Sequence, residues 1–191
     1  VLGIVTAVGS MVSMALCPLL IKKMNEKNAY ILLSVYGFVV SILSFIVGHF
    51  WFKDPSNMVL TVLFYASLFL IGLQFGAVTL MPMIMTADAV DYYEYETGKR
   101  MEGACYSILT LTIKVCLALG TAVGLIFVQA SGYYDGLSTG VFENSTKDMI
   151  FFAYTALPGI LALLSVIPMF KYDIVGEKKA MITSGLAERR K

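Results

Sequence analysis

Residues 104–132 read ACYSILTLTIKVCLALGTAVGLIFVQASG, an apolar stretch whose only charged side chain is Lys114. A helix of this length crosses the roughly 30 Å hydrocarbon core of a bilayer. Lys114 lies ten residues past the start of the stretch, which places its Cα about 15 Å deep, near the middle of the core. An unpaired charge there costs about 2.5 to 3.5 kcal/mol. We therefore expect Lys114 to face a water-filled cavity or a charged partner.

Four further apolar stretches occur in the 191-residue chain, in which 58% of the residues are hydrophobic and 14% are charged. This balance is unlike that of a soluble domain. The sequence predicts an all-α integral membrane protein with a transmembrane bundle over residues 1–171 and a polar, partly disordered tail over 172–191. The five spans are expected at about 1–21, 29–52, 58–87, 104–130 and 149–170.

The two ends of the chain and its basic residues give an expected orientation. The first span has neither an initiating Met nor a basic region before it, so we interpret it as part of a longer chain rather than as a signal peptide. All basic residues fall on one side of the membrane except Lys53 and Lys147 on the other side and Lys114 within it. By the positive-inside rule the lysine-rich side is cytoplasmic, the amino end starts outside and the tail is inside. The net charge of +1 gives no indication of nucleic-acid binding.

Three features outside the fourth span have structural rather than functional interpretations. His49 lies at the outer end of the second span and is expected at the membrane interface, because no second ligand is near it in the sequence. Pro158 and Pro168 predict a bend in the fifth span. Residues 131–148 are expected to form a flexible loop, in which Asn144 fits a glycosylation pattern that often occurs by chance.

Small polar side chains accompany Lys114 along the fourth span. Ser107, Thr110 and Thr121 lie on the same side of the helix as Lys114, by three- and four-residue spacings. Gly120 and Gly124 form a small-xxx-small pair, which predicts close packing of another helix. The fourth span is thus a membrane helix with a polar stripe.

Gln74 is a polar residue in the third span. It contacts either a ligand or a neighbouring helix, and hydrogen bonds between membrane helices are common.

A charged segment connects the third and fourth spans. Asp88, Asp91 and Glu94 recur every three residues, so a continued helix would place them on one face. Arg100 follows a Thr-Gly turn that can fold the chain back toward them, which predicts an ion-pair network. The alternative is a solvated charged loop.

An enzymatic interpretation of these acids is disfavoured. Paired aspartates at a membrane face can hold a divalent metal for phosphoryl transfer. Membrane phosphatidyltransferases, however, need a longer array of aspartates with interleaved glycines and an arginine, which is absent around Asp88 and Asp91. The sequence therefore predicts neither an enzyme nor a metal site.

A long pattern joins the charged segment to the fourth span: Asp88-Ala-Val-Asp91-Tyr92, Glu94, Gly98, Arg100, Glu102, Tyr106-Ser107 and Lys114. It resembles the glycoside-pentoside-hexuronide cation symporters, the melibiose permease family, within the major facilitator superfamily. The five spans are similar to the eighth to twelfth helices of that twelve-helix fold. The resemblance implies cation-coupled symport of a sugar or glycoside by alternating access, with a midplane sugar site between two six-helix halves.

The resemblance also implies roles for particular residues. Lys114 would lie beside the sugar and cation sites, and Thr110 would occupy a polar position one turn earlier. Ser107, Thr121 and Gln74 are further candidates for substrate or cation coupling. A cytoplasmic gate would comprise Asp88, Asp91, Glu94, Arg100 and Glu102. Leu109 departs from the melibiose permease, which has a glutamine there, so the resemblance does not specify the sugar.

The expected partners follow from the same resemblance. They are a small sugar or glycoside, a coupling Na+, Li+ or H+ and no other cofactor, the lipid bilayer, and the missing amino-terminal half of the same transporter, which would supply the acidic groups that bind the cation. The expected location is the bacterial inner membrane. The alternative is a non-transporting membrane module of the same fold, such as a structural subunit or a sugar sensor, which would tolerate loss of Lys114.

Overall fold

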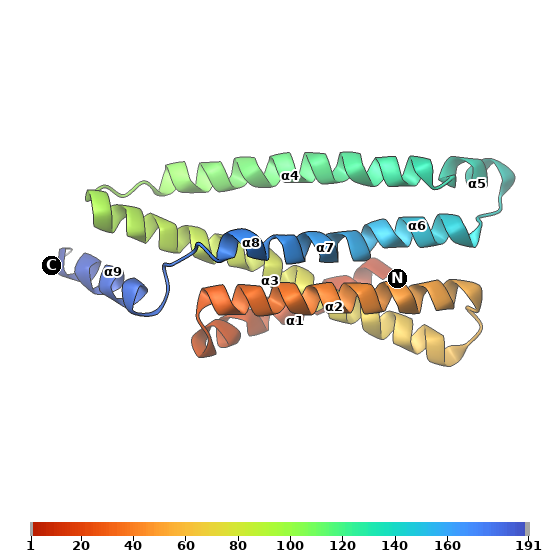
Figure 1. The fold of residues 1–191 in the computed structure, drawn as a ribbon, viewed down its shortest axis with the longest axis horizontal. Coiled ribbons are helices and arrows are strands. Elements are labelled where there is room, and N and C mark those ends of the chain that lie inside the picture. Colours follow the sequence, from red (N-terminus) through yellow and green to blue (C-terminus); the bar gives the residue numbers. More distant parts are fainter. Residues whose placement is uncertain (1, 190–191) are drawn as a thin grey trace.

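The computed structural model describes residues 2–189, which form nine helices and no strand (Figure 1). The long helices are α1 (Leu2–Lys23), α2 (Glu26–Lys53), α3 (Met58–Thr97) and α4 (Glu102–Ala130). The shorter helices are α5 (Tyr133–Thr139), α6 (Asn144–Tyr154), α7 (Ala156–Leu164), α8 (Val166–Met169) and α9 (Gly176–Arg189). Five helical stretches in the described residues are long and apolar enough to cross a membrane: Gly3–Lys23, Glu26–Lys53, Met58–Thr97, Glu102–Ala130 and Asn144–Met169. This confirms the predicted all-α membrane bundle.

The fifth stretch is bent by its prolines. It consists of α6, α7 and α8 in succession rather than one straight helix. α6 ends at Tyr154 and α7 ends at Leu164, each four positions before a proline, at Pro158 and Pro168. A proline has no N–H to bond the carbonyl four residues earlier, and its ring clashes with that carbonyl. The bends therefore occur where the prolines predict them.

Helix α3 extends well beyond the predicted third span. Its 40 residues correspond to about 60 Å, twice the thickness of a hydrocarbon core. The helix ends at Gly98, whose φ of 69° is left-handed and whose N–H donates to the carbonyl of Glu94 at 2.8 Å. Glycine adopts this conformation without the steric cost of a Cβ, so it stops the helix cleanly. Asp88, Asp91 and Glu94 thus lie in α3 itself and not in a loop after it.

Close packing of α1 against α3 depends on glycine. A Cβ at Gly72 would collide with the backbone of Thr6 and Gly9 on α1, so only glycine allows this approach. The sequence predicts close packing at Gly120 and Gly124 instead, but a Cβ added at either position would meet nothing within 4 Å in the described part of the chain. Their predicted packing is therefore not made within residues 2–189.

Helix α4 stands at the edge of the bundle. None of its residues is buried. Figure 1 shows it joined to α3 at one end and to α5 at the other, and it also contacts α6. The apolar core lies among α1, α2, α3 and α6, where Phe64, Leu68 and Phe151 are buried together and Trp51 stacks on Phe64 with ring centres 4.4 Å apart. The helix that carries Lys114 thus contributes none of its own residues to the buried core.

Two segments are more regular than the sequence predicts. Residues 176–189 form α9 instead of a partly disordered tail, because Ile182 and Leu186 bury their side chains against Tyr92, Tyr95 and Tyr172. The expected flexible loop at 131–148 contains α5 and the start of α6.

Candidate functional site

Lys114 lines a shallow groove on α4, which we call the Lys114 groove. It encloses about 410 Å³ and is lined by Gly103, Tyr106, Ser107, Thr110, Leu111 and Lys114. These positions recur every three or four residues, so they share one side of the helix. Ser107 and Thr110 therefore accompany Lys114 as the sequence indicates. Tyr106 was not among the predicted site residues, although its place in the same turn could have revealed it.

The threonine hydroxyls of α4 are satisfied by their own helix. Thr110 Oγ1 donates to the carbonyl of Tyr106 at 2.8 Å, and Thr121 Oγ1 donates to the carbonyl of Leu117 at 2.8 Å. Such a hydroxyl keeps its oxygen lone pairs available to a further donor. Thr121 lies on the polar stripe but does not line the Lys114 groove.

Gln74 lies elsewhere, between α3 and α2. It is 4% exposed, its side chain lies against Gly37, and its Oε1 accepts a hydrogen bond from Ser41 Oγ at 3.4 Å. It does not reach the Lys114 groove. Of the two interpretations of Gln74, the structure shows the hydrogen bond to a neighbouring membrane helix.

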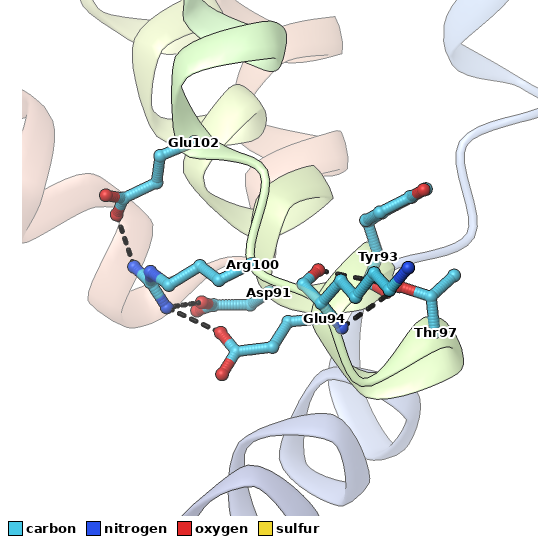
Figure 2. Close-up of polar contacts among 7 residues, drawn as sticks. Asp91, Tyr93, Glu94, Thr97, Arg100 and Glu102 are labelled. Atoms are coloured by element: carbon cyan, nitrogen blue, oxygen red, sulfur yellow. Dashed lines mark hydrogen bonds and ion pairs between the residues drawn. The ribbon is translucent and has the colours of Figure 1, made fainter.

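Arg100 gathers three carboxylates, which we call the Arg100 cluster (Figure 2). Its Nη1 lies 2.7 Å from Glu94 Oε2 and 3.3 Å from Asp91 Oδ1, and its Nη2 pairs with Glu102. Asp91 and Glu94 belong to the end of α3 and Glu102 begins α4, so the cluster ties the two helices together. Hydrogen bonds to Glu102 and then Glu94 raise the pKa of Arg100, which holds its charge at every accessible pH.

Asp88 is not part of the Arg100 cluster. Its carboxylate lies 2.7 Å from the ammonium group of Lys179 on α9, which also lies 2.6 Å from Glu26 Oε1 on α2. Tyr172 donates a hydrogen bond to Asp88 Oδ2 at 3.4 Å. We call these four residues the Lys179 cluster. The predicted grouping of Asp88 with Arg100 is therefore wrong for the arrangement seen here.

Electrostatics explain the protonation states in the Lys179 cluster. Burial acts to lower the pKa of Lys179, but its hydrogen bonds with Asp88 and Glu26 outweigh burial and raise the pKa above its usual value. Burial, and next the charge of Asp88, raise the pKa of the Tyr172 phenol. Lys179 therefore stays cationic and Tyr172 stays a hydrogen-bond donor. The sequence prediction does not include Lys179, Glu26 or Tyr172. The four-residue spacing of Ile182 and Leu186 does indicate a helix with an apolar face, and Lys179 lies on that helix.

His49 has a partner that its sequence neighbourhood does not reveal. Its Nδ1 lies 2.7 Å from Asp148 Oδ2, which joins α2 to α6. The sequence near His49 offers no second ligand, and the fold supplies Asp148 from 99 residues away. Within residues 2–189, no group of three or more His, Cys, Asp or Glu side chains is arranged to hold a metal ion.

Comparison with known proteins gives relatives along most of the chain. The Inner membrane symporter YicJ of Escherichia coli is 30% identical over 112 residues, which are 59% of this chain and 24% of that protein. The Glucuronide carrier protein homolog of the same organism is 25% identical over 187 residues, which are 96% of this chain and 38% of that protein. A Putative sulfoquinovose importer, also from Escherichia coli, is 25% identical over 183 residues, 94% of this chain and 36% of that protein.

The chain thus spans between 24% and 38% of the length of these curated relatives. No solved structure matches it. The sequence profile of the MFS/sugar transport protein family matches residues 1–176, which include all five stretches able to cross a membrane. This multi-pass membrane protein therefore belongs to the MFS/sugar transport protein family.

Proposed function

We propose that this chain is part of a secondary active transporter that moves a sugar or glycoside together with Na+, Li+ or H+ by alternating access. The observation that carries the proposal is the Lys114 groove: a lysine with neighbouring hydroxyl groups on one side of a membrane helix that has no buried residue. The relatives named as symporters, carriers and importers support the same class of activity.

The groove requires a covering that this chain does not provide. No acidic side chain in the described residues pairs with Lys114. A lysine near the bilayer centre is costly in contact with lipid, so it faces water or a counter-charge. The relatives are more than twice as long as this chain, and we infer that an amino-terminal half covers the groove and supplies the acidic partner.

The chemistry of the groove suits a sugar and a coupling cation. Lys114 donates hydrogen bonds only, the hydroxyls of Tyr106 and Ser107 can both donate and accept, as sugar hydroxyls do, and Thr110, whose proton is used within its own helix, can accept. The ammonium group would balance acidic groups of the other half until a cation arrives and shares them. Cation binding would thereby change the affinity for sugar, and sugar would change the affinity for the cation by the same factor.

Replacement of Lys114 by Ala in the full-length transporter tests this proposal. We expect loss of cation-driven sugar accumulation with normal amounts of protein in the membrane, because Lys114 is exposed among the described residues and is not part of their buried core. A matched pair of milder variants is Thr110→Ala and Thr112→Ala. Both hydroxyls donate to their own helix at 2.8 Å, but only Thr110 lines the groove, so only Thr110→Ala should raise the KM for the sugar.

Two outcomes would count against the proposal. Sodium-, lithium- and proton-driven accumulation that survives Lys114→Ala unchanged would remove Lys114 from the coupling site. Sugar binding without accumulation by the native full-length protein would favour the alternative of a non-transporting module.

A further inference from the structure

A second groove lies between α1, α2 and α3, and no residue of α4 lines it. It encloses about 710 Å³, within the roughly 300 to 1,000 Å³ of ligand-binding pockets. It exists because α1 and α2 each pack along α3 but scarcely touch one another. We call it the α1–α2 groove.

The α1–α2 groove has apolar walls, and it is open to the surroundings of the helix bundle. Leucine side chains from all three helices line it, and they keep large exposed fractions: 53% for Leu16, 47% for Leu32 and 40% for Leu70. The phenol of Tyr36 is already used, because it donates to the carbonyl of Leu70 at 3.1 Å. Since these residues lie in membrane-crossing helices, the groove offers a hydrocarbon chain a surface and offers a polar solute very little.

Positive charge collects at one end of the groove. Lys23 lines it and Lys22 is adjacent, at the end of α1, and neither lysine forms an ion pair with any described residue. The neighbouring charged residues are otherwise engaged. Lys27 donates to the carbonyls of Phe170 and Tyr172, and Glu26 pairs with Lys179. Two ammonium groups are therefore available where the apolar groove meets the edge of the membrane.

We propose that the α1–α2 groove binds one anionic phospholipid, with an acyl chain between α1 and α2 and the headgroup phosphate on Lys22 and Lys23. Charge complementarity selects this occupant: basic sites between membrane helices bind anionic headgroups, whereas a zwitterionic headgroup brings its own cation and gains less from the lysines. The site is separate from the Lys114 groove, so it does not depend on the proposed transport activity.

Native mass spectrometry of the full-length protein in mild detergent tests the headgroup. Phosphatidylglycerol and phosphatidylcholine with identical acyl chains are compared. We expect one phosphatidylglycerol to be retained, and the double variant Lys22→Gln with Lys23→Gln to lower its affinity about 30-fold, to the level of phosphatidylcholine. Lys99→Gln is the control, because Lys99 is exposed, lies on the same lysine-rich side and does not line the groove.

A second variant tests the groove itself. Leu16→Trp should fill the groove and abolish retention of the lipid, whereas Leu43→Trp should not, since Leu43 is equally exposed at 55% but lies outside the groove. Equal retention of the two lipids by the native protein would overturn the proposal. So would undiminished phosphatidylglycerol binding in Leu16→Trp. A third result would also overturn it: the native protein retains no lipid, and Leu16→Trp lowers the thermal stability of the protein. Together these two observations mean that another part of the protein fills the groove.

Discussion

Arg100 and Lys114 differ in whether their positive charge is paired within the described residues. Arg100 has three carboxylates of its own chain within reach, from the end of α3 and the start of α4. Lys114 has hydroxyl groups around it and no carboxylate among the described residues. The difference suggests separate roles. A charge that is already paired stabilises a conformation, whereas an unpaired charge in a membrane helix requires water or a counter-charge from elsewhere.

For Arg100, we predict a functional effect without a large loss of stability. The side chain is 42% exposed, and exposed ion pairs contribute about 0 to 1 kcal/mol each. We expect Arg100→Gln in the full-length transporter to lower the transport rate severalfold and to increase labelling of Cys105 from the lysine-rich side. Loss of the cluster frees the start of α4 from the end of α3 and shifts the population toward a state open on that side.

The matched control is Lys99→Gln. Lys99 adjoins Arg100, is exposed, and forms no ion pair with the described residues. Arg100→Lys should rescue only part of the rate, because lysine cannot hold several carboxylates with the fixed geometry of a guanidinium group. If Arg100→Gln left both Cys105 labelling and transport unchanged, the segment would be a solvated connector.

At the scale of elements, both charged and apolar contacts attach α9, and Arg189 adds a hydrogen bond to the carbonyl of Tyr95 at 2.7 Å. Lys179 bridges Asp88 and Glu26, which are 10% and 11% exposed at their side chains, while Ile182 and Leu186 cover tyrosines of α3. We predict that Lys179→Gln leaves two carboxylates without their cation and weakens the docking of α9 by about 1 to 3 kcal/mol. Hydrogen exchange in residues 176–189 should then accelerate.

Lys178→Gln serves as the adjacent comparison for this prediction. Its ion pair with Asp173 is short at 2.6 Å, but Asp173 is 71% exposed, and Lys178 also lies 4.9 Å from the centre of the Tyr92 ring. Losing these exposed contacts should weaken the docking of α9 less than losing the Lys179 cluster does. Equal acceleration of hydrogen exchange in the two variants would mean that the Lys179 cluster holds α9 no more strongly than the exposed contacts of Lys178 do.

The sequence predicts local features of the elements and misses the contacts between them. The five membrane spans follow from the lengths of the apolar stretches, and the ends of α6 and α7 follow from Pro158 and Pro168. Both signals are local in the sequence. The approach of Arg100 to Glu94 is also local. In contrast, Lys179 and Asp88 are 91 residues apart, and His49 and Asp148 are 99 apart. Such pairs depend on how helices pack, which residue spacing does not reveal.

The bundle as a whole leaves one long apolar helix uncovered. α4 has no buried residue, and Ile108, Leu111 and Leu119 are each more than 60% exposed. Apolar side chains in this state suit lipid or another helix, but Lys114 suits neither without water or a counter-charge. The two sides of α4 must therefore have different environments in the membrane, and the side with Lys114 is the one that should be wet.

Cysteine accessibility in the full-length transporter distinguishes these environments. In a background without Cys105 and Cys116, Thr110→Cys should react with a hydrophilic maleimide, because the reactive thiolate forms only where water reaches it. Sugar should slow this reaction, since Thr110 lines the Lys114 groove. Leu119→Cys should remain unreactive: Leu119 is 62% exposed in the bundle but lies roughly opposite Lys114 around the helix. Equal reactivity at the two positions, with no protection by sugar, would show that water reaches both sides of α4 alike, and the Lys114 groove could not then be assigned as the path of the substrate.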